Sequence, residues 1–193
     1  MSKGKYLILL ASDDLLCNDT IKQRVAILEE LEKNNKFVLI CDAQCIDNNG
    51  NLIYQSSMTQ YNKGLKENYY NDDNIINEVI TNPSISGPVV LINKRIYDTI
   101  GLYRENLMAE DWYFYQRVAA QKALVFKDII CSKYRIHNAN TSGINSNKSK
   151  KIALTCFLTY WYNWHYFPKI KHKYLALKQM AVWFLRYNIF CII

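Results

Sequence analysis

The sequence predicts an α/β fold with one main domain. The order of its apolar and amphipathic segments, its length and its composition support this. The apolar run "KYLILLA" at 5–11 is followed by an amphipathic helical pattern at 19–33 and by a second apolar run at 37–46. This order is typical of a β-α-β unit in a parallel sheet. The chain has 193 residues, half of them hydrophobic, which is enough for one core and a small appendage.

The individual elements follow in order. The run at 5–11 has no polar alternation, as expected of a strand that is covered on both faces. Asn18 or Asp19 can cap the next helix, which Asn34-Asn35 would end. The strand at 37–46 leads through the turn sequence "DNNG" into "NLIYQ", which predicts a hairpin.

The rest of the chain continues the α/β pattern. We expect a polar surface loop at 56–71, a short amphipathic helix at 72–82, and a strand with a short helix at 84–101. Next come a loop and a helix at 102–123, strand structure at 124–137, and a polar hinge that opens a basic, helical tail. The predicted domain boundaries are 1–145 for the main domain and 146–193 for the tail.

The charge and the cysteines indicate in which cellular environment the protein works. Lysine and arginine number 24 against 17 acidic residues, a net charge of +7, and much of the surplus lies in the tail. The six cysteines show no CxxC spacing and no signal-peptide pattern precedes them, which indicates a reducing, cytoplasmic environment. Cys41 and Cys45 lack a second metal-binding pair, so we expect buried strand cysteines and no zinc.

Three polar clusters lie at the ends of predicted elements. They are Asp13-Asp14 after the first strand, Glu110-Asp111 at a helix start, and "YRIHNANTS" at 134–142 after the last strand. Ligands of open α/β sheets bind at the carboxyl ends of strands, so these loops can converge on one cleft.

Each cluster has a chemical and a purely structural interpretation. Asp13 and Asp14 suit Mg²⁺ or Mn²⁺ with a diphosphate as a further ligand, but such a pair is also common in solvated turns. Asp111 precedes an aromatic run that would desolvate its carboxylate and make it a better proton acceptor; helix capping explains it as well. His137 is equally compatible with an ordinary hydrogen-bonded loop histidine.

Taken together and in order, these motifs resemble the family 2 glycosyltransferases, which use nucleotide sugars and have the GT-A fold. The resemblance runs from Gly4 to Ser142. Its matching pieces are "GKYLILLASDD", "DAQCIDNNGN", "SGPVVLINKRIYDTIGLYRENL", "EDWYFYQRVA" and "YRIHNANTS". It implies a GT-A-like, Rossmann-like mixed sheet flanked by helices, with the nucleotide-binding strands missing at the N-terminus and a helical tail at the C-terminus.

The resemblance also implies roles for single residues. Asp13 and Asp14 match the region whose carboxylates bind the cation, Mg²⁺ or Mn²⁺, that holds the donor diphosphate. Asp111 matches the expected general base, which deprotonates the acceptor hydroxyl. Four further positions would contribute to substrate binding, namely Glu110, Trp112, Gly87 and His137.

The implied activity is inverting transfer of a sugar from a nucleotide-diphosphate donor to a glycan or lipid-linked acceptor in cell-surface polysaccharide biosynthesis. A cation would stabilise the leaving group while a base activates the acceptor. The alternative is an inactive module that binds an acceptor, a membrane or a protein. No nucleic-acid-binding motif is present, so we expect no nucleic-acid partner.

Two departures from the family pattern stand out. Many relatives have Asp-Ser-Asp-Asp where this chain has Ala11-Ser12-Asp13-Asp14, so one carboxylate is absent. The usual first strand, similar to "VSVIIPTYN", and the nucleotide-binding half that follows it do not precede "MSKGKYL". We therefore expect the sequence to begin in the middle of a larger catalytic domain, with the strand at 5–11 exposed as a sheet edge.

The tail carries three of the four tryptophans together with many lysines. Its longest apolar run is shorter than the roughly 18 to 20 uncharged residues that a spanning helix needs. One interpretation is an interfacial helix resting on an anionic membrane, which would make the protein cytoplasmic and peripheral at the inner face of the cell membrane. The other is an ordinary helix that packs on the sheet.

Overall fold

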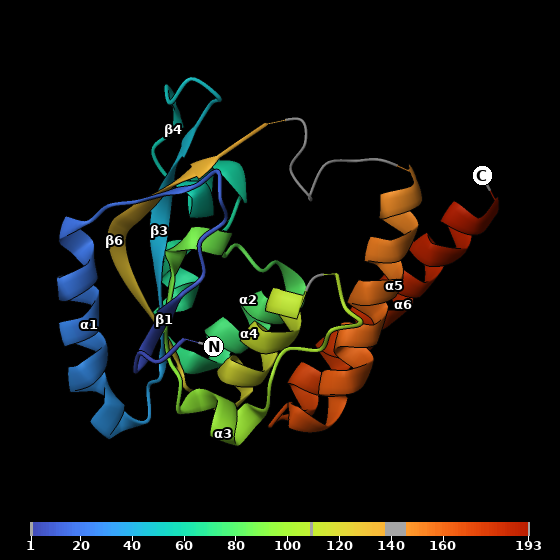
Figure 1. Ribbon diagram of the computed structural model, residues 1–193. Coiled ribbons are helices and arrows are strands. Elements are labelled where there is room, and N and C mark those ends of the chain that lie inside the picture. The colour runs from blue at the N-terminus through green and yellow to red at the C-terminus, as the bar shows by residue number, and fades with distance from the viewer. Residues whose placement is uncertain (1, 109, 138–145, 193) are drawn as a thin grey trace.

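The computed structural model describes residues 2–108, 110–137 and 146–192. Its centre is a six-stranded mixed sheet with the order β1-β5-β3-β6-β2, and β4 pairs with β3. Helix α1 lies on one side of this sheet, and α2 and α4 lie on the other, with α5 and α6 outside them (Figure 1). The strands are β1 Tyr6–Ile8, β2 Leu15–Leu16, β3 Val38–Ile46, β4 Leu52–Tyr54, β5 Val90–Asn93 and β6 Leu124–Arg135. The helices are α1 Asp19–Leu31, α2 Asp72–Thr81, α3 Ile96–Ile100, α4 Glu110–Ala120, α5 Ser146–Asn163 and α6 Ile170–Ile192.

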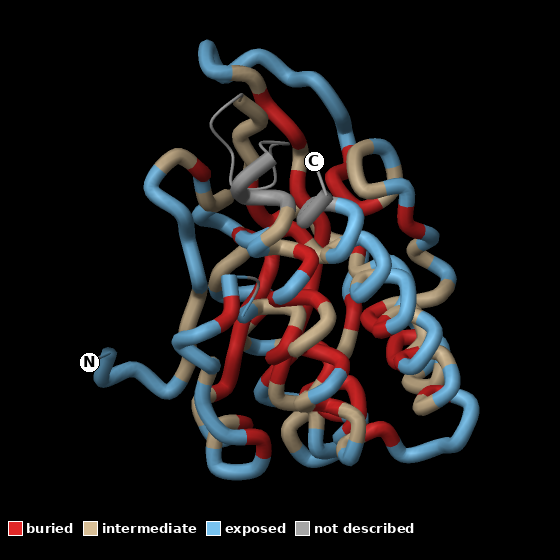
Figure 2. The backbone as a smooth tube through the Cα atoms, turned by 90° about the vertical axis from the view of Figure 1, so that its right-hand side faces the viewer, coloured by how far each residue is buried: buried red, intermediate tan, exposed pale blue. Residues whose placement is uncertain are grey.

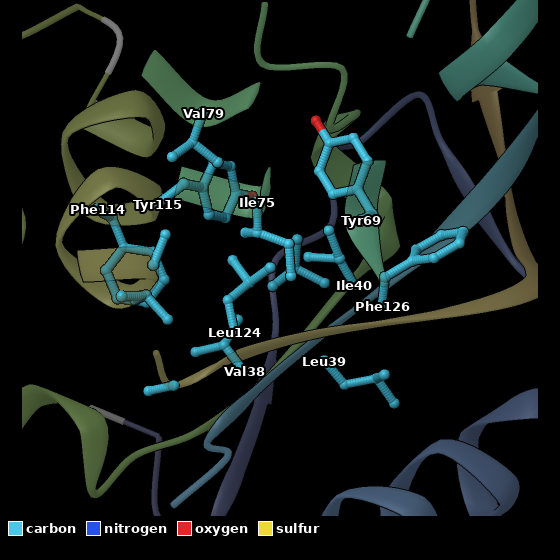
Figure 3. Packing of buried hydrophobic residues seen from close by; sticks show 14 of the residues in the cluster. Val38, Leu39, Ile40, Tyr69, Ile75, Val79, Phe114, Tyr115, Leu124 and Phe126 are labelled. Carbon is cyan, nitrogen blue, oxygen red and sulfur yellow. The ribbon is translucent and has the colours of Figure 1, made fainter. Parts of the chain in front are cut away.

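Strand β3 is the centre of the sheet. It pairs antiparallel with β5 and parallel with β6, so both of its edges are hydrogen-bonded. Val38 and Ile40 point toward α2 and α4, whereas Leu39 points toward α1 (Figure 3). Both faces are therefore covered, and all three side chains are fully buried. This explains why the strand is apolar without alternation.

The first strand differs from the expectation. Only Tyr6–Ile8 form β1, their side chains are half-buried, and Leu9 and Leu10 beyond them are 40% and 46% exposed. Among the described residues β1 pairs with β5 alone, so it is an edge strand. The prediction of a strand at 5–11 covered on both faces is wrong, because the strand has only three residues and their side chains are half-buried. The expectation that it forms an edge of the sheet is confirmed.

The sheet is also mixed where the local pattern predicted parallel pairing. Strands β1 and β3 each run antiparallel to β5, so they share a direction, but β5 lies between them. The mixed sheet flanked by helices agrees with the architecture that the family resemblance implies, and the C-terminal helices are present.

The predicted hairpin is confirmed. β3 and β4 pair antiparallel, and the Asp47 side chain accepts hydrogen bonds from the backbone N–H groups of Asn49 and Asn51, each at 2.8 Å. Gly50 has a φ of +88°, a conformation that side chains with a Cβ rarely adopt. Asn18 occupies the N-cap position of α1, as predicted, but its side chain makes no capping hydrogen bond.

The segment at 56–71 is not the surface loop that its polar composition predicted. Met58 and Tyr69 are each only 1% exposed. The reason is Asp42 of β3, a fully buried carboxylate that accepts hydrogen bonds from the Ser56 hydroxyl at 2.5 Å and the Met58 N–H at 3.1 Å. Lys66 completes this network at 2.9 Å from the same carboxylate. A buried charge needs such partners, and they fold the segment onto the sheet.

The tail is docked on the main domain. Helices α5 and α6 lie side by side and pack on α2 and α4 (Figure 1). The Tyr160 hydroxyl donates to the Ile80 carbonyl at 2.6 Å, and Asn163 Nδ2 donates to the Tyr113 carbonyl at 3.0 Å. Phe167 belongs to the same hydrophobic core as the sheet. The predicted boundary at residue 145 lies outside the described residues.

Residues at the centre of the molecule are more buried than those on the outer helices. Buried residues run through the central strands and the inner helix faces, while the outer turns of the helices are exposed (Figure 2). In the part of the chain that the structure describes, no helix is both long and apolar enough to cross a lipid bilayer.

Candidate functional site

The Asp13-Asp14 cluster and the start of the "YRIHNANTS" cluster meet at one edge of the sheet. Strand β2 pairs with β6 through Leu15 and Leu16, which brings the residues just before β2 against the end of β6. His137 Nε2 lies 2.7 Å from Asp13 Oδ2, and the Arg135 backbone N–H donates to Asp14 Oδ1 at 2.9 Å. Asp13, Asp14 and the first residues of "YRIHNANTS" are therefore neighbours; positions 138–142 of that motif lie outside the described residues.

Arg135 links three segments around this edge, and sequence reasoning missed it. Its Nε donates to the Asp13 carbonyl at 2.9 Å, and its guanidinium also donates to the Asp47 carbonyl at 2.5 Å. The loop before β2 and the β3–β4 turn are thereby attached to the end of β6. The only sequence signal was its position in "YRIH", two residues before His137.

The pKa values of the two neighbouring carboxyl groups are shifted in opposite directions. The hydrogen bond with His137 is the main cause that lowers the pKa of Asp13, and backbone hydrogen bonding adds to it. Asp14 is only 6% exposed, and this burial raises the pKa of its carboxyl group despite the bond from Arg135. Asp13 is therefore ionised at a lower pH than Asp14, and it is the more accessible of the two carboxylates.

A divalent cation would find few protein ligands here. Among the described residues, no three His, Cys, Asp or Glu side chains are grouped as a metal site. Asp13 and His137 supply two adjacent donors, while Asp14 Oδ1 is already an acceptor for Arg135. This set fits Mg²⁺ or Mn²⁺ only if water and phosphate oxygens complete the shell, which is common for Mg²⁺.

The Glu110-Asp111 cluster lies at the start of α4. Asp111 Oδ1 accepts the Trp112 N–H at 2.8 Å. Burial raises the pKa of Asp111, and the negative charge of Glu110 adds to this effect. The direction agrees with the sequence-based expectation that the aromatic surroundings desolvate this carboxylate.

The tail helices border this second acidic group. Trp112 contacts Trp183 of α6 edge to face, with ring centroids 6.2 Å apart. The Met108 N–H donates to the Thr155 hydroxyl of α5 at 3.3 Å. The described interactions of Asp111 include its own helix and a charge interaction with Cys156 of α5, and none of them involves Asp13, Asp14 or His137.

Two further features of the structure are the surroundings of Gly87 and a pocket in the tail. A Cβ built at Gly87 would meet nothing within 4 Å, so the fold itself does not require glycine there. Its expected role in the close approach of an acceptor stays a prediction. A pocket of about 460 Å³ between α5 and α6, lined by Trp161, Trp164 and four other residues, contains none of the predicted site residues.

Comparisons with known proteins support the fold. No protein-family model matches the chain, and no curated protein matches it in sequence. Among solved structures it is similar to a glycosyltransferase, TarS of S. aureus, residues 1–349 in complex with UDP-GlcNAc. The TM-score is 0.58 at 14% sequence identity, and the match covers 96% of this chain and 49% of that chain. The chain therefore has a glycosyltransferase-like fold, a curled mixed sheet flanked by helices.

Proposed function

We propose that this chain acts as a glycosyltransferase of the family 2 type, which transfers a sugar from a nucleotide-diphosphate donor with inversion. The observation that carries the proposal is the Asp13–His137 contact at the end of β6, on a fold that resembles a structure containing UDP-GlcNAc. The acceptor would be a glycan or a lipid-linked sugar of cell-surface polysaccharide synthesis.

In this proposal, the sheet edge binds the donor diphosphate. Asp13 and His137 would bind Mg²⁺ or Mn²⁺ there, and such a cation would neutralise the charge that builds on the diphosphate as it leaves. Arg135 orients Asp13 because it binds the carbonyl of that residue at 2.9 Å. Asp14 supports the same loop from its buried position.

Asp111 is the proposed general base. Its carboxylate would take the proton of the acceptor hydroxyl while the hydroxyl oxygen forms a bond to the anomeric carbon and the bond to the diphosphate breaks. A raised pKa improves a carboxylate as a proton acceptor, because the efficiency of a base rises with its basicity. Glu110 and Trp112, on the same helix turn, would contact the acceptor, and Gly87 would leave room for it.

The donor proposal is tested by calorimetric titration with UDP in the presence of Mn²⁺. Binding to the wild type should be lost or strongly weakened in Asp13→Ala. Asp98→Ala is the matched control, because Asp98 is an exposed carboxylate on α3. Circular dichroism of both variants shows whether they are folded. Equal binding by all three proteins would contradict the proposed donor site.

We further propose that α6 rests on an anionic membrane, which would make the protein peripheral at the inner face of the membrane. An outward stripe of apolar side chains follows helical spacing, and it includes Tyr174 (56% exposed), Leu177 (50%), Val182 (42%), Leu185 (61%) and Ile189 (54%). Lys178 and Arg186 lie exposed on the same helix, beside the rings of Tyr174 and Trp183. Apolar side chains interleaved with basic ones are typical of interfacial helices.

Flotation with lipid vesicles tests this contact. The wild type should float with vesicles rich in anionic lipid and much less with zwitterionic ones, because the positive charge contributes to binding. The double variant Val182→Ser/Leu185→Ser should lose flotation. Leu102→Ser is the control, since Leu102 is 75% exposed but lies before α4. No preference between the two vesicle types would contradict the charge argument.

A further inference from the structure

His172 is a buried titratable side chain that the proposed sugar transfer does not use. It lies in the first turn of α6 and is fully buried, and neither of its ring nitrogens has a hydrogen-bond partner among the described residues. Ala176 and Met180 follow it at helical spacing, and both belong to the hydrophobic core. His172 therefore lies on the face of α6 that packs on the main domain.

Ion pairs attach the start of α6 to α2 beside this histidine. Lys169 Nζ, one residue before α6, pairs with Asp73 Oδ2, and Lys171 Nζ lies 3.7 Å from the same oxygen. Both lysine side chains are half exposed, so these charges lie at the surface, whereas the side chain of His172 lies inside. A neutral imidazole can be buried there, but an imidazolium would be a charge without an acceptor.

We propose that His172 makes the docking of α6 on α2 sensitive to pH, because its neutral ring allows the helix to dock and its protonation releases the helix. The proposal concerns the position of the tail and does not depend on the proposed sugar transfer. Release would also affect the start of α4, since Trp183 of α6 contacts Trp112 edge to face. Mild acid would therefore remove part of the cover beside the Glu110-Asp111 cluster.

The carboxylates of α2 do not supply a counter-charge for a protonated His172. The charge of Asp73 acts on His172, but this carboxylate is already shared by two lysines. The other two carboxylates have partners of their own, since Asp72 pairs with a lysine at 2.5 Å and Glu78 accepts from an asparagine amide at 2.6 Å. Helix α2, which the structure describes throughout, therefore offers no unpaired carboxylate to an imidazolium.

Helix α5, which also packs on α6, supplies no counter-charge either. Its sequence contains no acidic residue. Its Lys150 lies over the Tyr187 ring, with Nζ 5.4 Å from the centroid, and so belongs to the opposite end of α6. Burial raises the pKa of Cys156 to about 12 and raises that of Tyr160 as well, so both are neutral in mild acid. His165, between the two helices, is exposed to solvent.

The surroundings shift the pKa of His172 in the direction that this device needs. Burial is the largest cause that lowers the pKa, and the charges of Lys171 and Lys169 act in the same sense, while Asp73 opposes them. A buried base with a lowered pKa binds fewer protons in the docked state than in the released state. Docking is therefore fully favoured above about pH 6.5, the ordinary pKa of histidine, and weakens as the pH falls below it.

Hydrogen exchange of the α6 amides in the full chain, followed by mass spectrometry, tests the release. After correction for the intrinsic rate, exchange of α6 in the wild type should increase about tenfold or more between about pH 7.5 and about pH 5, whereas exchange of β3 should change little. The Lys169–Asp73 pair stays ionised over this range, because the bond with Lys169 lowers the pKa of Asp73. No increase in α6 exchange would overturn the proposal.

The variant His172→Leu tests whether this residue is responsible. Leucine is apolar and cannot be protonated, so α6 should stay protected at both pH values. The matched control His165→Leu, at an exposed position of the tail, should respond as the wild type does. A response that persists in His172→Leu would overturn the proposal and point to another group, such as Asp111, whose pKa is raised by burial.

NMR titration of the histidine rings in the wild type keeps the test valid if His172→Leu fails to fold. The ring of His172 should titrate below the ordinary value of about 6.5, and α6 should lose its protection over the same pH range. Titration of His172 at or above that value, or protonation of His172 with α6 still protected, would overturn the proposal.

Discussion

His137 Nε2 lies 2.7 Å from Asp13 Oδ2, although the two residues are 124 positions apart in the sequence. The contact exists because β2, only two residues long, pairs with β6 and aligns the residues before it with those after β6. The same contact lowers the pKa of Asp13. This one contact therefore brings together the two proposed cation ligands and lowers the pKa of one of them.

Removing His137 should change Asp13 in a measurable way. In His137→Ala the pKa of Asp13 should rise toward the ordinary value of about 3.9, since its main stabilising partner is gone. NMR titration of the Asp13 carboxyl group measures this directly. Affinity for UDP with Mn²⁺ should fall about tenfold or more, because His137 is one of the two proposed protein ligands of the cation.

His165→Ala is the control for that variant, because His165 is exposed and lies far along the chain in the tail. The lowered pKa of Asp13 also predicts how the stability of the protein depends on pH. A carboxylate with a lowered folded-state pKa contributes stability above its unfolded pKa and loses it as pH falls through the folded pKa. His137→Ala should therefore lose less stability on acidification than the wild type; an unchanged acid profile would contradict the role of this pair.

Asp14 should behave in the opposite way. Its folded-state pKa is raised by burial, so its ionised form opposes folding at neutral pH, and stability increases as pH falls through that pKa. Asp14→Asn removes the charge and keeps an oxygen that can accept the Arg135 N–H. We expect a higher Tm than that of the wild type at neutral pH and a weaker pH dependence. Asp98→Asn should leave the Tm unchanged, and a lower Tm for Asp14→Asn would mean that its charge is stabilising.

Asp111→Asn tests the proposed base. In a preparation that transfers sugar, the rate should fall by roughly 10²- to 10⁴-fold, the usual contribution of general base catalysis, while UDP binding stays near normal. The acid limb of the wild-type rate profile should lie above the ordinary pKa of an aspartate, because burial raises the pKa of Asp111. Glu110→Gln should cost much less. Near-normal transfer by Asp111→Asn would exclude the residue as the base.

Asn163 should be important for the docking of the tail. Its amide donates to the Tyr113 carbonyl and to Gln116 Oε1, each at 3.0 Å, and accepts from Arg117 Nε at 3.0 Å. Asn163→Ala leaves these groups unsatisfied, so the free energy of unfolding should fall by about 1 to 3 kcal/mol. Asn188→Ala, at an exposed position of α6, should stay within about 0.5 kcal/mol of the wild type. Urea denaturation compares the two, and equal losses would contradict the tail contact.

The amino-acid sequence determined the local elements well where periodicity was strong. The apolar run of β3, the amphipathic pattern of α1 and the Asp-Asn-Asn-Gly turn before β4 each specify one structure through local burial and turn chemistry. The sequence also indicated that Asp13-Asp14 and the residues after β6 come at strand ends. The desolvation of the Asp111 carboxylate followed from its aromatic neighbours.

Only the tertiary structure decided how these pieces meet. The insertion of β5 between β1 and β3 depends on long-range pairing, which local hydrophobicity does not encode. For the same reason the role of Arg135 was hidden, since its acceptors at Asp13 and Asp47 are 122 and 88 positions away.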